Sequence, residues 1–141
     1  MMKFIIVCNL IAAISIVATE GKTFAKCDLA KELLKKNFSK EDMPKWLCLV
    51  DKLSGYSTSK EESTAIGTKT IGLFQFSEET DCGTKTARGR CNAKCDALKT
   101  DDITTAARCA LQMNTDRQFN FWPIWKNSTC RTNTQNYVCS L

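Results

Sequence analysis

The sequence predicts a single α+β domain of mainly helical character, with a small β-sheet region and a framework of disulfide bonds. The chain has 141 residues, which is enough for one compact domain with its own core and too few for two. Apolar residues recur at helical spacing in three stretches, and a stretch with strand-type alternation lies between the second and the third. The nine cysteines complete the prediction, because such a count is typical of small secreted proteins held by disulfides.

The N-terminus has the order of a secretory signal peptide. Lys3 is followed by an apolar run over residues 4–17, and small and polar residues come next. A membrane-spanning helix needs about 20 apolar residues, so this run is too short for an anchor. We therefore expect residues 1–21 to be removed, with a cut after Ala18 as the alternative. Residues 22–141 are then expected to form one secreted, extracellular domain.

The cysteines indicate that bridges exist but do not give their pairing. Cys8 lies in the signal segment, so eight cysteines remain, and an even number implies a disulfide framework. Eight cysteines allow about 105 pairings. Cys91 and Cys95 also have a spacing that suits zinc, which is the alternative to disulfides for these two residues.

Three stretches are predicted to be amphipathic helices. The first covers residues 27–36, with apolar side chains on one face and Lys and Glu on the other. The second runs from Asp42, its N-cap, to Gly55, with a proline in its first turn. The third is capped by Thr100 or Asp101. The residues expected to face inward are Leu29, Ala30, Leu33 and Leu34, then Met43, Trp46, Leu47, Val50 and Leu53, and finally Ile103, Ala106, Ala107, Ala110 and Leu111.

The β region is expected between the second and third helices. Ser, Thr and Gly punctuate residues 57–76, and Phe74-Gln75-Phe76 alternates as a half-buried strand does. A loop-rich segment over residues 81–96 follows, and an aromatic region over residues 119–125 precedes the polar tail. No repeat, linker or low-complexity tract divides the chain, so these elements are predicted to share one core.

Composition limits the chemistry that the chain can perform. It contains no histidine, which excludes Ser–His and Cys–His catalysis, histidine metal sites and histidine pH switches. Any catalysis has to come from carboxylates, Lys, Tyr or Ser. The net charge of +5 favours contact with anionic surfaces such as bacterial walls. The same charge equally serves solubility alone, so both interpretations stay open.

Short motifs are distributed along the whole mature chain. They are Lys22-Thr23-Phe24, Cys27-Asp28-Leu29-Ala30, Trp46-Leu47-Cys48-Leu49-Val50, Gly72-Leu73-Phe74-Gln75, Cys91-x3-Cys95, Asp102-Ile103-Thr104, Cys109 and Trp122-x2-Trp125-Lys126-Asn127. Taken together, the chain resembles c-type lysozymes and α-lactalbumins, with an insect-type N-terminus and all eight cysteines in order. The resemblance implies the c-type lysozyme fold, a mainly helical lobe beside a small β-sheet lobe. It also implies the disulfides Cys27–Cys139, Cys48–Cys130, Cys82–Cys95 and Cys91–Cys109.

The resemblance further implies two catalytic carboxylates, and this chain has neither. Glycoside hydrolysis needs one carboxyl as general acid and a second, ionised one that stabilises or traps the developing cation. The position of the acid holds Leu53, and the position of the second carboxylate holds Thr70. Asp51 points about 200° away from Leu53 around its helix. Glu62 and Glu78 each lie eight residues from Thr70, so none of these acids is expected to substitute.

Calcium binding, which the family shows in α-lactalbumin, is not expected. Among the acid positions before the third helix, only Asp102 carries a carboxylate, and Thr100, Thr105 and Ala106 occupy the other three. Calcium takes six to eight oxygen ligands with several charges. Asp101 and Asp102 are therefore interpreted as charges that favour the helix start, and neither a metal nor a cofactor is predicted.

Part of the family's sugar groove is retained in the sequence. Gln75, Asp116 and Trp122 match positions that line this groove, although Trp122 also has an interpretation as core packing, because indoles bury well. Thr80-Asp81 replaces an aromatic platform and Ser77 replaces an Asn. Substrate binding is therefore expected to be weakened.

Two sequons are candidates for N-glycosylation. They are Asn37-Phe38-Ser39 and Asn127-Ser128-Thr129. Asn127 is expected to lie near a packed helix, so Asn37 is the favoured site.

Three hypotheses about function stay open. The leading one is a secreted, catalytically inactive lysozyme-like protein (a pseudoenzyme of glycoside hydrolase family 22) that binds bacterial cell-wall glycans or acts as an antibacterial factor of innate immunity. The second is a non-enzymatic regulator or recognition protein, as α-lactalbumin is for a glycosyltransferase and other relatives are for gametes. The third is a weak muramidase that uses unorthodox acids. The expected partner is peptidoglycan or another glycan, with no nucleic acid and no membrane span, and the chain is expected to be a monomer.

Overall fold

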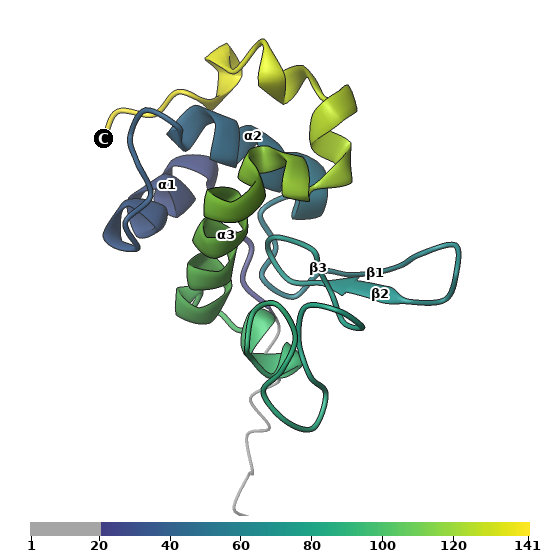
Figure 1. Ribbon diagram of the computed structural model, residues 1–141. Coiled ribbons are helices and arrows are strands. Elements are labelled where there is room, and N and C mark those ends of the chain that lie inside the picture. Colours follow the sequence, from purple (N-terminus) through teal and green to yellow (C-terminus); the bar gives the residue numbers. More distant parts are fainter. Residues whose placement is uncertain (1–20) are drawn as a thin grey trace, which may run out of the picture.

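The protein is described here by a computed structural model that covers residues 21–141. The predicted signal segment lies outside the described residues except for its last residue. Three helices and the C-terminal turns form one lobe, and a small antiparallel sheet with a loop-rich segment forms the other (Figure 1). Within residues 21–141 no helix is both long enough and apolar enough to cross a membrane. The predicted α+β architecture, with a helical lobe and a small sheet lobe, is confirmed.

Helix α1 spans Lys26–Lys35, one residue from the predicted bounds. It ends in a turn in which the amide of Phe38 donates to the carbonyl of Leu33 (3.1 Å) and the amide of Asn37 donates to that of Leu34 (3.2 Å). Asn37 has a φ of 70°, the left-handed conformation that this turn requires and that Asn tolerates better than most residues. The turn leaves the Asn37 side chain exposed.

Helix α2 spans Met43–Ser54 and runs through the helical lobe. Pro44 lies in its first turn, and Gly55, with a φ of 58°, ends it by donating its amide to the carbonyl of Asp51. Asp42 precedes the helix as predicted, but its carboxylate pairs with Lys45 at 2.9 Å instead of capping a backbone amide.

Helix α3 spans Thr104–Arg117 and starts later than predicted. The carboxylate of Asp102 accepts hydrogen bonds from the amide (2.9 Å) and the hydroxyl (2.6 Å) of Thr104. These bonds hold the pKa of Asp102 below its ordinary value. Neither Thr100 nor Asp101 caps the helix, because Asp101 instead contacts the N-terminal segment of the described chain. The interpretation of Asp101 as a helix-start charge is therefore wrong, and that of Asp102 agrees with the structure.

The sheet has three short antiparallel strands in the order β1-β2-β3, namely Glu61–Ser63, Lys69–Ile71 and Phe76–Ser77. The turn between β1 and β2 is closed by the amide of Thr64, which donates to the carbonyl of Thr68 at 2.7 Å. The prediction that Phe74-Gln75-Phe76 is a half-buried strand is wrong for its first two residues, since only Phe76 lies in β3. Phe74 and Gln75 lie in a turn before β3 and both are buried, because this segment passes between the sheet and the helical lobe.

Four disulfides join the chain in the pairing that the resemblance implies. Two of them, Cys27–Cys139 and Cys48–Cys130, hold the C-terminal segment against α1 and α2. The other two, Cys82–Cys95 and Cys91–Cys109, close the loop-rich segment and tie it to α3. Cys91 and Cys95 are both oxidised in these bonds, so the zinc alternative is wrong.

An aromatic cluster fills the core between the lobes. Trp46 of α2 lies at its centre, with ring centroids 4.7 Å from Phe119, 4.9 Å from Phe38 and 5.4 Å from Trp122. Its contacts with Trp122 and Phe119 are edge-to-face, the arrangement that aromatic quadrupoles favour. The aromatic region after α3 forms two 3-10 helices, Gln118–Phe121 and Pro123–Asn127, which carry these rings into the core.

Candidate functional site

The first carboxylate position lies on the last turn of α2. Leu53 is half-buried there and packs against the hydrophobic core. An alkyl side chain has no proton to give, so nothing at this position can protonate a leaving oxygen. The core contact also explains locally why the residue is apolar, since it completes the stripe that begins at Met43.

The second carboxylate position lies in the middle of β2. The hydroxyl of Thr70 donates to the side-chain oxygen of Gln75 at 2.6 Å. The side-chain amide of Gln75 in turn donates to the carbonyls of Lys60 (3.0 Å) and Gly72 (2.8 Å). Gln75 is only 9 % exposed, and both hydrogens of its amide have protein acceptors. Gln75, which the resemblance assigns to the sugar groove, therefore supports the sheet more than it offers free groups to a ligand.

Glu62 lies closer to the vacant carboxylate position than the sequence separation indicates. The sheet register places Glu62 of β1 directly opposite Thr70 of β2, and residues directly opposite point to the same face. The carboxylate of Glu62 is exposed and lies 3.6 Å from the ammonium of Lys60. Eight residues of separation therefore do not keep Glu62 away from Thr70, because the hairpin folds back on itself, and the expectation that Glu62 does not act as a substitute acid stays a prediction. The turn at Ile66-Gly67 could have predicted this neighbour from the sequence, because a hairpin centred on residue 66 pairs residue 62 with residue 70.

The other two acids do not approach the site as substitutes. Asp51 accepts a hydrogen bond of 2.6 Å from the hydroxyl of Tyr137, which ties it to the C-terminal segment. Burial and this carboxylate raise the pKa of Tyr137 to about 12. Glu78 follows β3 and lines a shallow pocket beside Lys69 and the tip of the β1–β2 hairpin. Among the three candidate acids, only Glu62 faces the same side of the sheet as Thr70.

Trp122 is a core residue in this structure. Its side chain is 2 % exposed, and its indole nitrogen donates to the carbonyl of Phe74 at 2.8 Å. This bond joins the helical lobe to the turn that precedes β3. Phe121 covers one edge of the indole, with ring centroids 4.9 Å apart. The interpretation of Trp122 as a core residue therefore agrees with its burial. Its indole nitrogen already has an acceptor, so it offers no free donor to a ligand.

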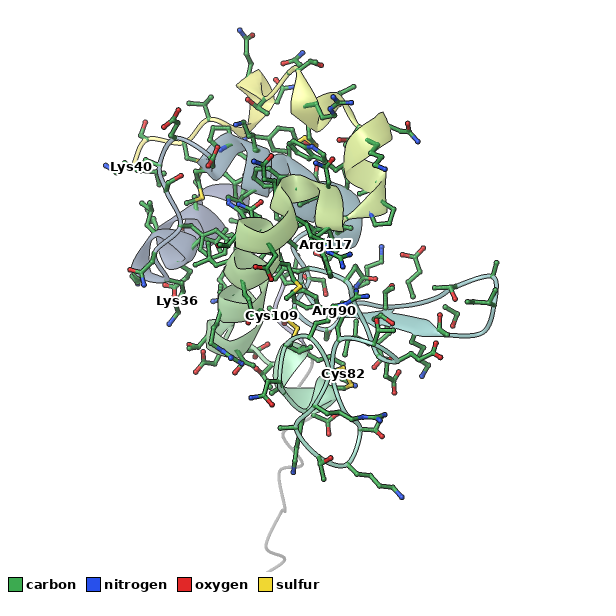
Figure 2. All side chains as sticks on the ribbon, viewed as in Figure 1. Lys36, Lys40, Cys82, Arg90, Cys109 and Arg117 are labelled. Carbon is green, nitrogen blue, oxygen red and sulfur yellow. A yellow bond between two sulfur atoms is a disulfide. The ribbon has the colours of Figure 1, made fainter. Side chains whose placement is uncertain are left out.

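Asp81, at the position of the missing aromatic platform, points inward. It is 2 % exposed, and its carboxylate accepts a hydrogen bond from the amide of Ser77 at 2.7 Å. Arg90 lies 3.3 Å from the same carboxylate and 5.8 Å from the ring centre of Phe121. Figure 2 shows Arg90 at the junction of the loop-rich segment with the helical lobe. A buried carboxylate, and the guanidinium of Arg90 over the ring of Phe121, thus stand where the resemblance implies a flat surface on which a sugar could stack.

The remaining predicted site residues lie on the surface. Asp116 is exposed in the last turn of α3. Both sequon residues, Asn37 and Asn127, are exposed, so burial does not distinguish them as expected. Within the described residues, no cluster of three or more Cys, Asp or Glu side chains suits a metal ion. The face of the sheet that carries Glu62 and Thr70 is therefore the candidate site, with one carboxylate and no general acid at the position of Leu53.

Comparison with known proteins gives a consistent answer. The family model described as C-type lysozyme/alpha-lactalbumin family matches residues 22–139. A lysozyme of Bombyx mori is 42 % identical over 112 residues, which are 79 % of this chain and 82 % of that protein. Lysozyme-like protein 1 of Mus musculus is 35 % identical over 133 residues, 90 % of this chain and 89 % of that one. The crystal structure of a lysozyme from Litopenaeus vannamei superposes with a TM-score of 0.69 at 30 % identity, covering 79 % of this chain and 90 % of that one.

Proposed function

Because the chain belongs to the C-type lysozyme/α-lactalbumin family and carries Leu53 and Thr70 at its two carboxylate positions, we propose that it is a secreted, non-catalytic member that binds bacterial cell-wall glycans. In this proposal the protein still binds peptidoglycan but does not cleave its glycosidic bonds. An antibacterial role in innate immunity is the biological setting that fits such a protein.

The observation that carries the proposal is the packing of Leu53. Loss of general acid help alone costs about 10² to 10⁴ in rate. The neighbours that would have raised the pKa of a glutamic acid here are still apolar, since the residue contacts the hydrophobic core. The position therefore keeps the apolar surroundings that would suit an acid but has no acid, and the sheet face that carries Thr70 keeps one carboxylate, that of Glu62.

Binding is supported by polar groups on the sheet face beside Thr70 and by Asp116, which the resemblance assigns to the sugar groove. The sheet face presents Glu62, Thr70 and the ammonium of Lys60, and Asp116 lies exposed at the end of α3. Hydroxyl and carboxylate groups of this kind suit the hydroxyls and amides of an amino sugar. The net charge of +5 adds an attraction to anionic wall polymers that does not depend on the groove.

The test is to measure binding and cleavage on the same material. Purified protein should sediment with insoluble peptidoglycan and should fail to clear a bacterial wall suspension at any pH from about 4 to 8, the range in which family carboxylates work. Clearance within about a hundredfold of an ordinary lysozyme of this family would overturn the loss of catalysis, and Glu62→Gln would then show whether Glu62 is the active carboxylate. Failure to sediment with peptidoglycan or chitin would overturn the binding role.

Matched variants separate groove binding from charge attraction. Asp116→Ala and Glu62→Ala each remove one negative charge from the proposed groove, and Glu41→Ala removes the same charge from the exposed loop before α2. A groove role predicts weaker sedimentation for the first two variants only. If all three variants bind the wall polymer equally, binding depends on net charge and the groove plays no part.

A further inference from the structure

The backbone nitrogen of Lys22 has two acceptors, which a peptide amide can serve only by sharing its one hydrogen between them. It donates to the carboxylate of Asp101 at 2.8 Å and to the hydroxyl oxygen of Thr58 at 2.9 Å. A peptide N–H has one hydrogen, whereas an ammonium group has three and a positive charge. Both acceptors, one of them anionic, therefore suit the N-terminal ammonium of a processed chain better than the amide of a continuous one.

Thr58 fixes this nitrogen in place. Thr58 is 1 % exposed, its amide donates to the carbonyl of Lys22 at 2.9 Å, and its hydroxyl lies 3.1 Å from the same carboxylate oxygen of Asp101. Two residues further on, the amide of Phe24 donates to the carbonyl of Tyr56 at 3.0 Å. The start of the domain is thus paired with the segment after α2, and the nitrogen of Lys22 has a defined position.

The side chain of Lys22 does not compete for Asp101. Its ammonium lies over the ring of Phe24, 4.4 Å from the centroid. The nearby Lys99 is also engaged, since it pairs with Glu61 at 2.8 Å and with Asp96 at 3.5 Å. Asp101 is therefore left to the α-nitrogen and to Thr58.

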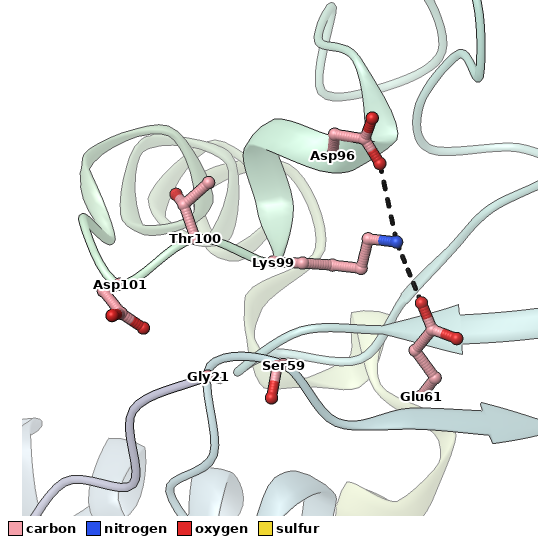
Figure 3. Close-up of a pocket in the computed structure, with 7 residues that line it drawn as sticks. All are labelled: Gly21, Ser59, Glu61, Asp96, Lys99, Thr100 and Asp101. Carbon is pink, nitrogen blue, oxygen red and sulfur yellow. Dashed lines mark hydrogen bonds and ion pairs between the residues drawn. The ribbon is translucent and has the colours of Figure 1, made fainter. Parts of the chain in front are cut away.

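Gly21 lines a pocket of about 510 Å³ next to these groups (Figure 3). Ser59 and Asp101 line the same pocket, and a Cβ on Gly21 would overlap with the hydroxyl of Ser59. The close approach of Ser59 therefore favours glycine at residue 21. A small residue before the cleavage site is also what a signal-removing endopeptidase requires. The match to the family model begins at Lys22.

We propose that, once the leader is removed at the Gly21–Lys22 peptide bond as the sequence predicts, the ammonium group created there docks onto Asp101 and Thr58. Hydrolysis by an endopeptidase adds one water across the bond. Gly21 leaves with the carboxylate, and the nitrogen of Lys22 takes up protons to become an ammonium ion. Removal of the leader thereby converts a shared amide hydrogen bond into an ion pair between the first residue and the loop before α3.

The ion pair makes the processed chain more stable than the extended one. Lys22 and Asp101 are both exposed, and an ammonium–carboxylate contact at an exposed site contributes at most about 1 kcal/mol, which is about fivefold in the unfolding equilibrium constant. The nitrogen of Lys22 already lies within hydrogen-bond distance of Asp101 and Thr58 in the uncut chain. The new ammonium group can therefore form the ion pair with little rearrangement of its neighbours. Salt screens such a pair, so the contribution should shrink at about 1 M ionic strength.

A four-protein cycle tests the docking. Chains that start at Lys22 or at Gly21 are compared, each with and without Asp101→Asn, by urea unfolding in low salt. We expect Asp101→Asn to raise the unfolding equilibrium constant about fivefold in the chain that starts at Lys22 and less than twofold in the chain that starts at Gly21. Equal effects in the two chains would overturn the docking.

Asp96→Asn is the matched control, because Asp96 lines the same pocket but pairs with Lys99 and does not contact Lys22. Its effect should be the same in both chains. The processing site is tested separately by N-terminal sequencing of the protein secreted from eukaryotic cells that express the full chain. Lys22 as the first residue supports the proposal, and Thr19, which follows a cut after Ala18, contradicts it.

Discussion

Restoring both carboxylates, with Leu53→Glu and Thr70→Asp, should give a poor enzyme. The two acids return to backbone positions that the family uses, and retaining chemistry needs them about 5 Å apart. The obstacle lies at β2. The oxygen of Gln75 now accepts the hydrogen of Thr70, and the amide of Gln75 is held by two backbone carbonyls. A carboxylate at residue 70 would therefore face the side-chain oxygen of Gln75, which is also an acceptor. The Gln75 amide cannot flip to donate to it without losing both bonds to the backbone carbonyls.

The cost in stability can be worked from the burial of each residue. A fully buried leucine side chain contributes about 1.5–3 kcal/mol, so the half-buried Leu53 loses about 1 kcal/mol of apolar burial when it becomes Glu. Partial desolvation of the new carboxyl adds about 1 kcal/mol. Loss of the 2.6 Å bond from Thr70 costs about 1 kcal/mol more. The double variant should be about 3 kcal/mol less stable, a fall in Tm of about 12 °C for a domain of this size.

The assay is the initial rate on a soluble chitin-type polymer, with Tm measured on the same samples. We expect activity above that of the parent chain and at least about a hundredfold below an active relative, because the sugar also has to be held and distorted. Thr70→Asn is the matched control, since its amide can donate to Gln75 and preserve the local geometry. A double variant as active as a relative would refute this reasoning and would show that the carboxylates were the only loss.

Three further outcomes are expected. Thermal stability should not depend on calcium, because Asp102 is the only acid at the family's ligand positions and already accepts two bonds from Thr104; a Tm several degrees lower with chelator would contradict this. Burial raises the pKa of Tyr56 and, together with Asp51, that of Tyr137 to about 12, both above the ordinary value near 10. Stability should therefore be fully present below about pH 10 and fall as the pH rises towards 12; phenolate absorbance that develops with a midpoint near pH 10 in the folded protein would count against it. Asn37 and Asn127 are both exposed, so both should carry glycans after expression in eukaryotic cells, and a glycosidase-sensitive mass shift lost in Asn37→Gln or Asn127→Gln identifies each site.

Local signals in the sequence predicted the helices of the first half well. The left-handed Gly55 ends α2 where expected, and Pro44 begins it, because both residues act through their own backbone geometry. The start of α3 was missed by a few residues for the opposite reason. Asp101 looked like a cap in its local context, but its partners are Lys22 and Thr58, which are distant along the chain.

The same distinction applies to the candidate site. Leu53 was predicted to belong to the apolar stripe of its helix, and helical periodicity was sufficient for that inference. Glu62 was missed because its place beside Thr70 depends on strand register, which is set by the turn at Ile66-Gly67 and not by distance along the chain. The alternation of Phe74-Gln75-Phe76 was misleading, since a buried turn can show the same apolar pattern as a strand.

The bridge between Cys27 and Cys139 makes residues 27–139 a closed covalent ring. Among residues 21–141 the most exposed large apolar side chain is that of Ile66, 85 % exposed at the tip of the β1–β2 hairpin, and exposed loop tips are where proteases cut most readily. A cut there opens the ring without releasing a fragment, because Cys48–Cys130 also spans the break. A nicked molecule thus gains one water but stays one covalent species until it is reduced, and gels run with and without reductant would tell the nicked form from the intact one. The two long-range bridges thus make the covalent integrity of the domain independent of the peptide bonds at the hairpin tip.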